Sequence, residues 1–74
     1  MQNKTLFGKR IKELRLEKGL TQKQLAQELQ IALSTLRRYE RGITERKITL
    51  LIKCADYFQV STDYLVGRTN IRNS

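Results

Sequence analysis

Histidine and proline are absent from this chain of 74 residues, and Cys54 is its only cysteine. A single cysteine forms no disulfide within the chain, and without histidine the sequence has no conventional zinc site. Nucleophilic catalysis by a Ser–His or Cys–His pair is excluded as well, as is a histidine general base. We therefore expect no enzyme, no metal and no cofactor, and we expect Cys54 to be a small core residue.

Long hydrophobic runs are also missing from the sequence. No stretch approaches the roughly 18 apolar residues of a membrane-spanning helix, and charges follow the first residues, where a secretory signal would be apolar. Hydrophobic residues nevertheless make up 39% of the chain, which is typical of a folded protein rather than a disordered basic tail. A chain this short forms one domain at most, and we expect it in the cytoplasm.

Positive charge, in contrast, is abundant. Lysine and arginine number 15 against 7 acidic residues, which gives a net charge of +8. An excess of this size indicates an anionic partner, either nucleic acid or an acidic membrane surface. Residues 1–23 hold seven of the basic residues and residues 37–47 hold five, so the excess is concentrated in two segments.

Apolar residues recur at helical spacing in five short segments, and no segment shows the alternation of a strand. The sequence therefore predicts an all-α domain of five short helices over residues 1–67, followed by a polar, basic and mobile tail over residues 68–74. Gly8 lowers the helical propensity of the first segment, so its first turn is expected to fray. Three further glycines are expected to end helices: Gly19, Gly42 and Gly67.

Two helix starts are marked by side-chain caps. Thr21 and Gln24 have the spacing of a capping box, and Leu20 and Leu25 have that of a hydrophobic staple. Ser61 is expected to cap the fifth helix.

The fourth helix is apolar on more than one side, which favours a central position in the core. Its first stripe contains Ile48, Leu51, Ile52, Ala55 and Phe58, and its second contains Leu50, Cys54 and Tyr57.

The third segment, residues 32–43, combines an apolar back with a basic front. Its inward side holds Ala32, Leu36, Tyr39 and Ile43, its opposite side holds Ser34, Arg37, Arg38 and Arg41, and Leu33 lies on the flank. Two helices joined by a short turn, the second exposing a row of arginines, form a helix-turn-helix arrangement. The major groove of B-DNA admits one α-helix, and the base edges there present distinguishable donors and acceptors.

The sequence resembles the lambda repressor/Cro family, also called the XRE family. The resemblance lies in residues 20–26 (LTQKQLA) followed by residues 34–42 (STLRRYERG), and in residues 55–67 (ADYFQVSTDYLVG). It implies a lambda-repressor-like DNA-binding domain of five helices. It also implies a cytoplasmic transcriptional regulator, a repressor of phage or mobile-element type, that binds a near-palindromic double-stranded DNA operator as a homodimer. We expect no small-molecule ligand.

The resemblance assigns roles to individual residues. Gln22 would hold a phosphate at the start of the second helix, and Arg15 of the first helix would pair with Glu40 of the third. The residues facing the major groove would be Leu33, Ser34, Arg37 and Arg38, and those contacting the DNA backbone or an adjacent minor groove would be Arg41, Arg46 and Lys47. Which arginine reads a guanine is left open. Among the basic residues of the first helix, expected to be solvated, Arg10 is the best phosphate candidate.

Three positions depart from the family pattern. Gln30 stands where the turn usually has glycine, at a cost of about 1 kcal/mol if the residue is left-handed. Ala32 replaces the usual Ser or Thr cap of the third helix and forgoes about 1 kcal/mol of capping. Lys47 or a neighbour replaces a common proline in the following loop. These departures concern the geometry of the turn and the loop rather than the fold.

Two other functions stay open at the level of the sequence. The same fold could act as a protein-interaction module, such as an antitoxin or antirepressor that masks a partner protein, with its fifth helix and tail presented to another chain. The third hypothesis is a basic amphipathic peptide on a membrane surface. The capped helices and inward apolar stripes argue against the membrane hypothesis.

Overall fold

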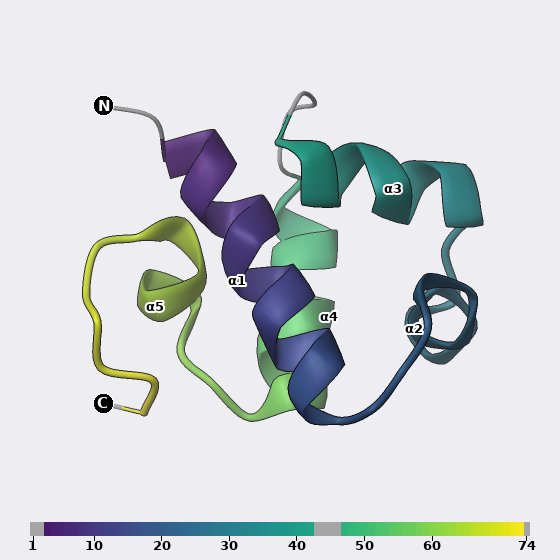
Figure 1. Cartoon of the computed structure of the whole chain (residues 1–74). Coiled ribbons are helices and arrows are strands. Elements are labelled where there is room, and N and C mark those ends of the chain that lie inside the picture. The colour runs from purple at the N-terminus through teal and green to yellow at the C-terminus, as the bar shows by residue number, and fades with distance from the viewer. Residues whose placement is uncertain (1–2, 43–46, 74) are drawn as a thin grey trace.

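The computed structural model describes residues 3–42 and 47–73 of the chain. Five α-helices and no strand occur in these residues (Figure 1), so the predicted all-α fold is confirmed. The helices are α1 (Asn3–Glu17), α2 (Gln22–Leu29), α3 (Leu33–Arg41), α4 (Ile48–Phe58) and α5 (Thr62–Val66). Two residues of the sequence predictions, Ile43 and Arg46, lie outside the described residues.

The predicted caps are confirmed. The Thr21 hydroxyl accepts a hydrogen bond from the backbone N–H of Gln24, whose side chain accepts one from the backbone N–H of Thr21. Ser61 caps α5 by accepting from the N–H of Tyr64. Gln30 does adopt the left-handed conformation, with φ 59° and ψ 46°, and Ala32 provides no side-chain cap for α3.

The hydrophobic core draws residues from every helix. Helix α1 packs against α3 and α5, α2 packs against α3 and α4, and α4 packs against α5. In Figure 1, α3 lies across one end of the molecule, where α1 begins, and the C-terminal end of α1 lies at the other. Cys54 is buried in this core, as predicted, and desolvation raises the pKa of its thiol to about 12. The thiol is therefore protonated at neutral pH and serves as a small apolar group.

Gly8 marks the closest approach of α1 to α3. A Cβ atom at this position would overlap the carbonyl oxygen of Tyr39 and lie 2.8 Å from that of Glu40. Both obstacles are backbone atoms, so no side-chain rotation would make room. The glycine that lowers helical propensity is thus what allows α1 to contact the C-terminal half of α3.

Only one side of α4 is covered by the rest of the domain. Leu50, Cys54, Ala55 and Phe58 are buried in the core. Ile48, however, is 70% exposed and Ile52 is 48% exposed. The expectation that the first apolar stripe would be buried is therefore wrong at its N-terminal end. Neighbouring helices cover the opposite side of α4, and the sequence pattern could not distinguish the two sides.

The C-terminal segment folds back against α1 and α5. The backbone N–H of Ser61 donates to the carbonyl oxygen of Arg72 at 2.6 Å. The Arg72 guanidinium forms an ion pair with Glu17 at 2.6 Å, and its Cζ lies 5.6 Å from the centre of the Tyr64 ring. Polar contacts therefore hold residues 68–73 against α1 and α5.

Candidate nucleic-acid interface

Helix α3 has one buried side and one fully polar side. Leu36 and Tyr39 are buried in the core. The outward side carries the residues that the sequence analysis placed there, all of them exposed: Ser34, Arg37, Arg38 and Arg41. None of their four side chains forms a hydrogen bond or ion pair with another residue of the described part of the chain. Their donors are therefore available to an external partner.

The four outward residues are not equivalent. At about 100° per residue, Ser34, Arg38 and Arg41 lie nearly opposite the buried Leu36. Arg37 lies closer to the flank of α3 that carries Leu33, which is half-buried and packs against the core. Ser34, Arg38 and Arg41 thus point away from the domain, and Ser34 and Arg38 lie one helical turn apart.

An ion pair in the protein interior holds α3 against α1. Arg15 Nε lies 2.8 Å from Glu40 Oε2 and Arg15 Nη2 lies 3.2 Å from Oε1, with side chains only 9% and 4% exposed. Arg15 Nη1 also donates to the carbonyl oxygen of Leu20 at 2.8 Å. The Arg15–Glu40 pair implied by the family resemblance is confirmed, and it fixes the end of α3 relative to the start of α2.

The first turn of α2 joins the same network. Gln22 Nε2 donates to Glu40 Oε1 at 3.0 Å, which uses one of its two N–H groups. The second N–H leaves the predicted phosphate contact of Gln22 chemically possible. Lys23, the next residue, is exposed and was not among the predicted contacts.

Arg10 is buried rather than solvated. Arg10 is only 8% exposed, and its Cζ lies 4.1 Å from the centre of the Tyr64 ring. The guanidinium donates to the carbonyl oxygens of Tyr64 and Thr69 and to Oδ1 of Asn70. The expectation of a solvated Arg10 is therefore corrected, because the C-terminal segment and α5 enclose its guanidinium.

The basic residues after α3 lie at the start of α4. Lys47 is exposed and precedes the first turn of α4, whose N-terminus has no side-chain cap. Arg46, predicted beside it, falls outside the described residues. Of the predicted contacts, the structure therefore places Gln22 and Lys47 near α3, whose outward side carries the exposed arginines. Arg10 lies apart from them, against α5 and the C-terminal segment.

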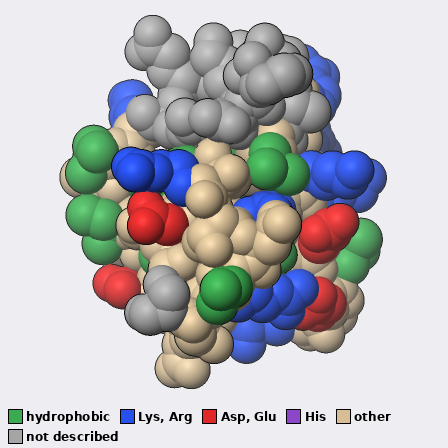
Figure 2. Space-filling view, turned by 90° about the vertical axis from the view of Figure 1, so that its left-hand side faces the viewer, with side chains coloured by type: hydrophobic (Ala, Val, Ile, Leu, Met, Phe, Trp, Pro, Cys, Tyr) green, Lys and Arg blue, Asp and Glu red, His purple; other side chains and the backbone are tan. Residues whose placement is uncertain are grey.

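The described residues also bear on two other features, a metal site and a membrane-spanning helix. No group of three or more metal-ligating side chains occurs there, and no described helix is long and apolar enough to cross a membrane. Figure 2 views the domain from the side of α5 and the C-terminal segment. Blue and red side chains are interspersed on this face with exposed hydrophobic ones, unlike the exclusively basic charges on the outward side of α3.

Comparisons with known proteins agree with this geometry. The family model described as Helix-turn-helix matches residues 11–65. Among curated relatives, the HTH-type transcriptional regulator ImmR of Bacillus subtilis is 41% identical over 65 residues, which are 88% of this chain and 51% of ImmR. The SPbeta prophage-derived uncharacterized HTH-type transcriptional regulator YonR of the same organism is 35% identical over 88% of this chain and 60% of YonR. The chain thus spans between half and two thirds of the length of these two relatives.

Solved structures extend the comparison to three dimensions. The N-terminal DNA-binding domain of SinR from Bacillus subtilis superposes with a TM-score of 0.77 and 33% identity, covering 84% of this chain and 91% of that one. SinR in the SinR/SinI complex superposes with a TM-score of 0.74 and 37% identity. The match covers 80% of this chain and 58% of that one. With a family model matched over most of its length and the fold confirmed, this chain belongs to the XRE-type helix-turn-helix family.

Proposed function

We propose that the protein is a sequence-specific DNA-binding transcriptional regulator that inserts α3 into the major groove. The observation that carries the proposal is the outward side of α3, where three exposed arginines and a serine have no partner in the described residues. The buried Arg15–Glu40 pair holds this helix in place, so the side chains are presented from a rigid support. The protein would act in the cytoplasm, where its operator lies.

Roles are proposed from where the described side chains lie and, for Arg46, from the family resemblance alone. Arg38 and Ser34 lie one turn apart on the outward side of α3 and are the proposed base-reading pair, with Leu33 and Arg37 beside them in the groove. The remaining contacts are proposed to be to the sugar–phosphate backbone or an adjacent minor groove: Gln22, Arg41, Arg46 and Lys47. Backbone contacts set the position of the protein on the duplex, whereas base contacts set sequence preference.

Selection of duplex DNA from a random pool, followed by footprinting, tests the proposal directly. We expect one enriched near-palindromic sequence whose half-sites lie about 34 Å apart. If a dimer neutralises about 6–10 phosphates, the logarithm of the affinity should fall against the logarithm of the salt concentration with a slope of about −5 to −9. A flat salt dependence, or a pool without an enriched sequence, would overturn the proposed function.

Arg38→Ala is expected to weaken binding to the selected operator more than binding to unrelated duplex. A good bidentate contact between arginine and guanine discriminates by about 1–3 kcal/mol, so specificity should fall by about 5- to 150-fold in binding titrations at constant salt. Arg68→Ala, which removes an exposed arginine near the C-terminus, should leave specificity unchanged. An equal loss on both duplexes for Arg38→Ala would reassign this residue to a phosphate.

The homodimer is proposed to form through the exposed end of α4. The domain measures 28 × 23 × 20 Å, so two copies with recognition helices about 34 Å apart lie close enough to touch. Ile48 and Ile52 are exposed on α4, which starts near α3. Two other exposed hydrophobic residues, Leu16 and Ile71, belong to the end of α1 and to the C-terminal segment, away from α3 (Figure 1).

Ile52→Lys separates this dimer contact from DNA binding. The added charge favours DNA, so affinity for a duplex with one half-site should stay equal or rise, while two lysines facing each other across the dimer axis should repel. We expect cooperative binding to the full operator to be lost, with at least about tenfold weaker affinity, or about 1.4 kcal/mol. Leu16→Lys is the matched control. Full cooperativity in Ile52→Lys would exclude α4 as the interface.

The finer assignment to a repressor of phage or mobile-element type is part of the same proposal. Its support is the prophage-derived relative YonR. An operator that overlaps a promoter, with lower reporter expression when the protein is present, is the expected result. Activation of the reporter would contradict it.

A protein partner is the second candidate function. The observation that favours it is the superposition on SinR in a complex with SinI. Co-purification of a stoichiometric partner, with no duplex enriched from the random pool, would favour this alternative over the DNA-binding one.

A further inference from the structure

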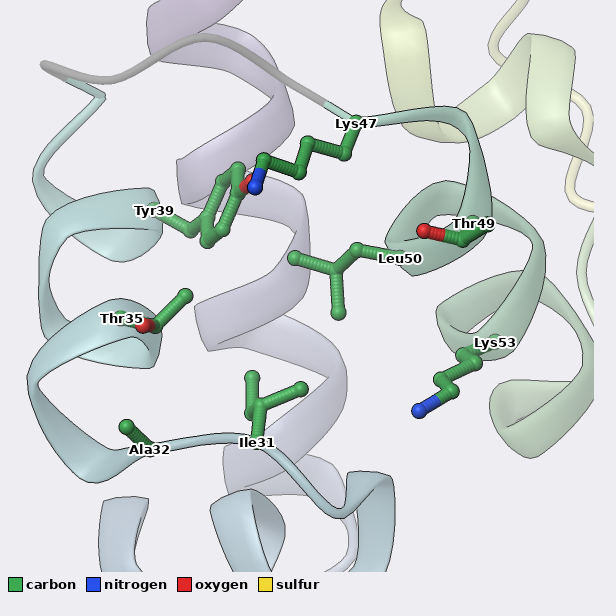
Figure 3. Close-up of a pocket in the computed structure, with 8 residues that line it drawn as sticks. All are labelled: Ile31, Ala32, Thr35, Tyr39, Lys47, Thr49, Leu50 and Lys53. Atoms are coloured by element: carbon green, nitrogen blue, oxygen red, sulfur yellow. The ribbon is translucent and has the colours of Figure 1, made fainter.

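A pocket of about 290 Å³ lies between α3 and the start of α4 (Figure 3). Residues of the turn before α3, of α3 itself and of the first turns of α4 line it. The lining residues are Ile31, Ala32, Thr35, Tyr39, Lys47, Thr49, Leu50 and Lys53. This pocket is on the flank of α3 that faces α4, so it is distinct from the outward row that carries Ser34 and Arg38.

The Tyr39 hydroxyl lies at this pocket without a hydrogen-bond partner among the described residues. The residue is only 4% exposed, and its ring packs edge-on against Phe7 with centroids 5.8 Å apart. No residue in the described part of the chain hydrogen-bonds to the Tyr39 hydroxyl. Figure 3 shows the Tyr39 ring and the Lys47 side chain among the residues that line the space between the helices. Since buried hydroxyls are normally hydrogen-bonded, an unused one at a pocket indicates a ligand position.

The chemistry of the lining favours an anion. Two lysines and three hydroxyl groups line the pocket, and no carboxylate is among its described lining residues. Lys53 already donates to the carbonyl oxygen of Leu29 at 3.1 Å, whereas Lys47 is exposed and has no ion pair in the described residues. The adjoining N-terminus of α4 lacks a side-chain cap, so its backbone N–H groups add positive potential. The apolar floor is formed by Ile31 and Leu50.

We propose that this pocket binds a phosphate group, with the Tyr39 hydroxyl and the Lys47 ammonium as its two principal donors. A tetrahedral anion offers several acceptor oxygens, which matches donors converging from two helices. The phosphate comes either from the DNA backbone beside the major groove or from a small phosphorylated molecule. The first source rests on the proposed function, whereas the second does not. In either case Tyr39 binds the ligand besides packing in the core.

Inorganic phosphate is the first probe, titrated into the isotopically labelled protein at constant ionic strength with chloride as the reference anion. We expect saturable shifts of the backbone amide signals of Thr35 and of Lys47 to Leu50. Tyr39→Phe removes one oxygen atom that has no partner in the described residues, so the variant should unfold at the same midpoint as the wild type. It should nevertheless bind phosphate about tenfold more weakly, since a hydrogen bond to a charged group is lost. Tyr57→Phe, at a half-buried tyrosine outside the pocket, should change neither property.

DNA titrations with the same variants distinguish the two sources. If Tyr39→Phe weakens binding to operator and to unrelated duplex equally, and Lys47→Gln lowers the salt slope by about one, the pocket holds a phosphate of the DNA. If phosphate binding falls while DNA affinity is unchanged, the ligand is a small phosphorylated molecule. Absence of saturable shifts with phosphate, together with wild-type DNA affinity in Tyr39→Phe, overturns the proposal, whether or not the random pool yields an operator for the wild type.

Discussion

Replacing Glu40 with alanine is expected to lower the free energy of unfolding by about 3–5 kcal/mol, because it leaves the buried guanidinium of Arg15 without its counter-charge. Arg15 and Glu40 are 9% and 4% exposed in their side chains, so water cannot replace the lost carboxylate. The substitution also removes the acceptor of Gln22 Nε2. Urea denaturation followed by circular dichroism measures the effect, which is a large fraction of the stability of a small domain.

Two variants make this prediction specific. Glu28→Ala removes an exposed carboxylate of α2 and should change the free energy of unfolding by no more than about 0.5 kcal/mol. Combining Arg15→Met with Glu40→Leu removes both charges and should recover most of the stability lost in Glu40→Ala. A loss below about 1 kcal/mol in Glu40→Ala would mean that the pair behaves like an exposed salt bridge, and the proposed rigid support of α3 would lose its basis.

Gly8→Ala is expected to destabilise the domain by about 2–3 kcal/mol, although alanine gains about 1 kcal/mol over glycine in a helix. The new methyl group would collide with the backbone carbonyls of Tyr39 and Glu40, so α1 would have to move away from α3. The same denaturation experiment measures this loss, and affinity for the operator should fall with it because the position of α3 depends on the contact.

Gly19→Ala provides the matched control for Gly8→Ala. Gly19 has a φ of 71°, and a Cβ atom there would meet nothing within 4 Å. Its substitution should therefore cost only the backbone strain of a left-handed alanine, about 1 kcal/mol. Wild-type stability in Gly8→Ala would show that the two helices can separate freely at their crossing.

Features encoded by neighbouring residues were predictable from the sequence. The capping box at Thr21 and the cap at Ser61 follow from side chains that bond to the backbone three residues later, and both were predicted. The outward position of Ser34 and Arg38 follows from helical periodicity once Leu36 and Tyr39 face the core. The Arg15–Glu40 pair joins distant segments, and only the family resemblance pointed to it.

Features that depend on distant packing were not predictable. Arg10 was expected to be a solvated basic residue, because nothing nearby in the sequence indicates that the C-terminal segment encloses it. Gly8 suggested a weak helix start, since the carbonyl oxygens that require it belong to α3. The two stripes of α4 were equally apolar, so the exposure of Ile48 became evident only from the placement of the neighbouring helices.

The missing partners of the outward residues of α3 have an evolutionary consequence. Because Ser34, Arg37, Arg38 and Arg41 form no hydrogen bond or ion pair with other described residues, substitutions among them cost the fold little. Under the proposed function, selection can therefore change the DNA sequence that the protein recognises without first accumulating stabilising mutations elsewhere. Residues such as Glu40 and Gly8 lack that freedom, so related proteins should diverge fastest where α3 faces outward.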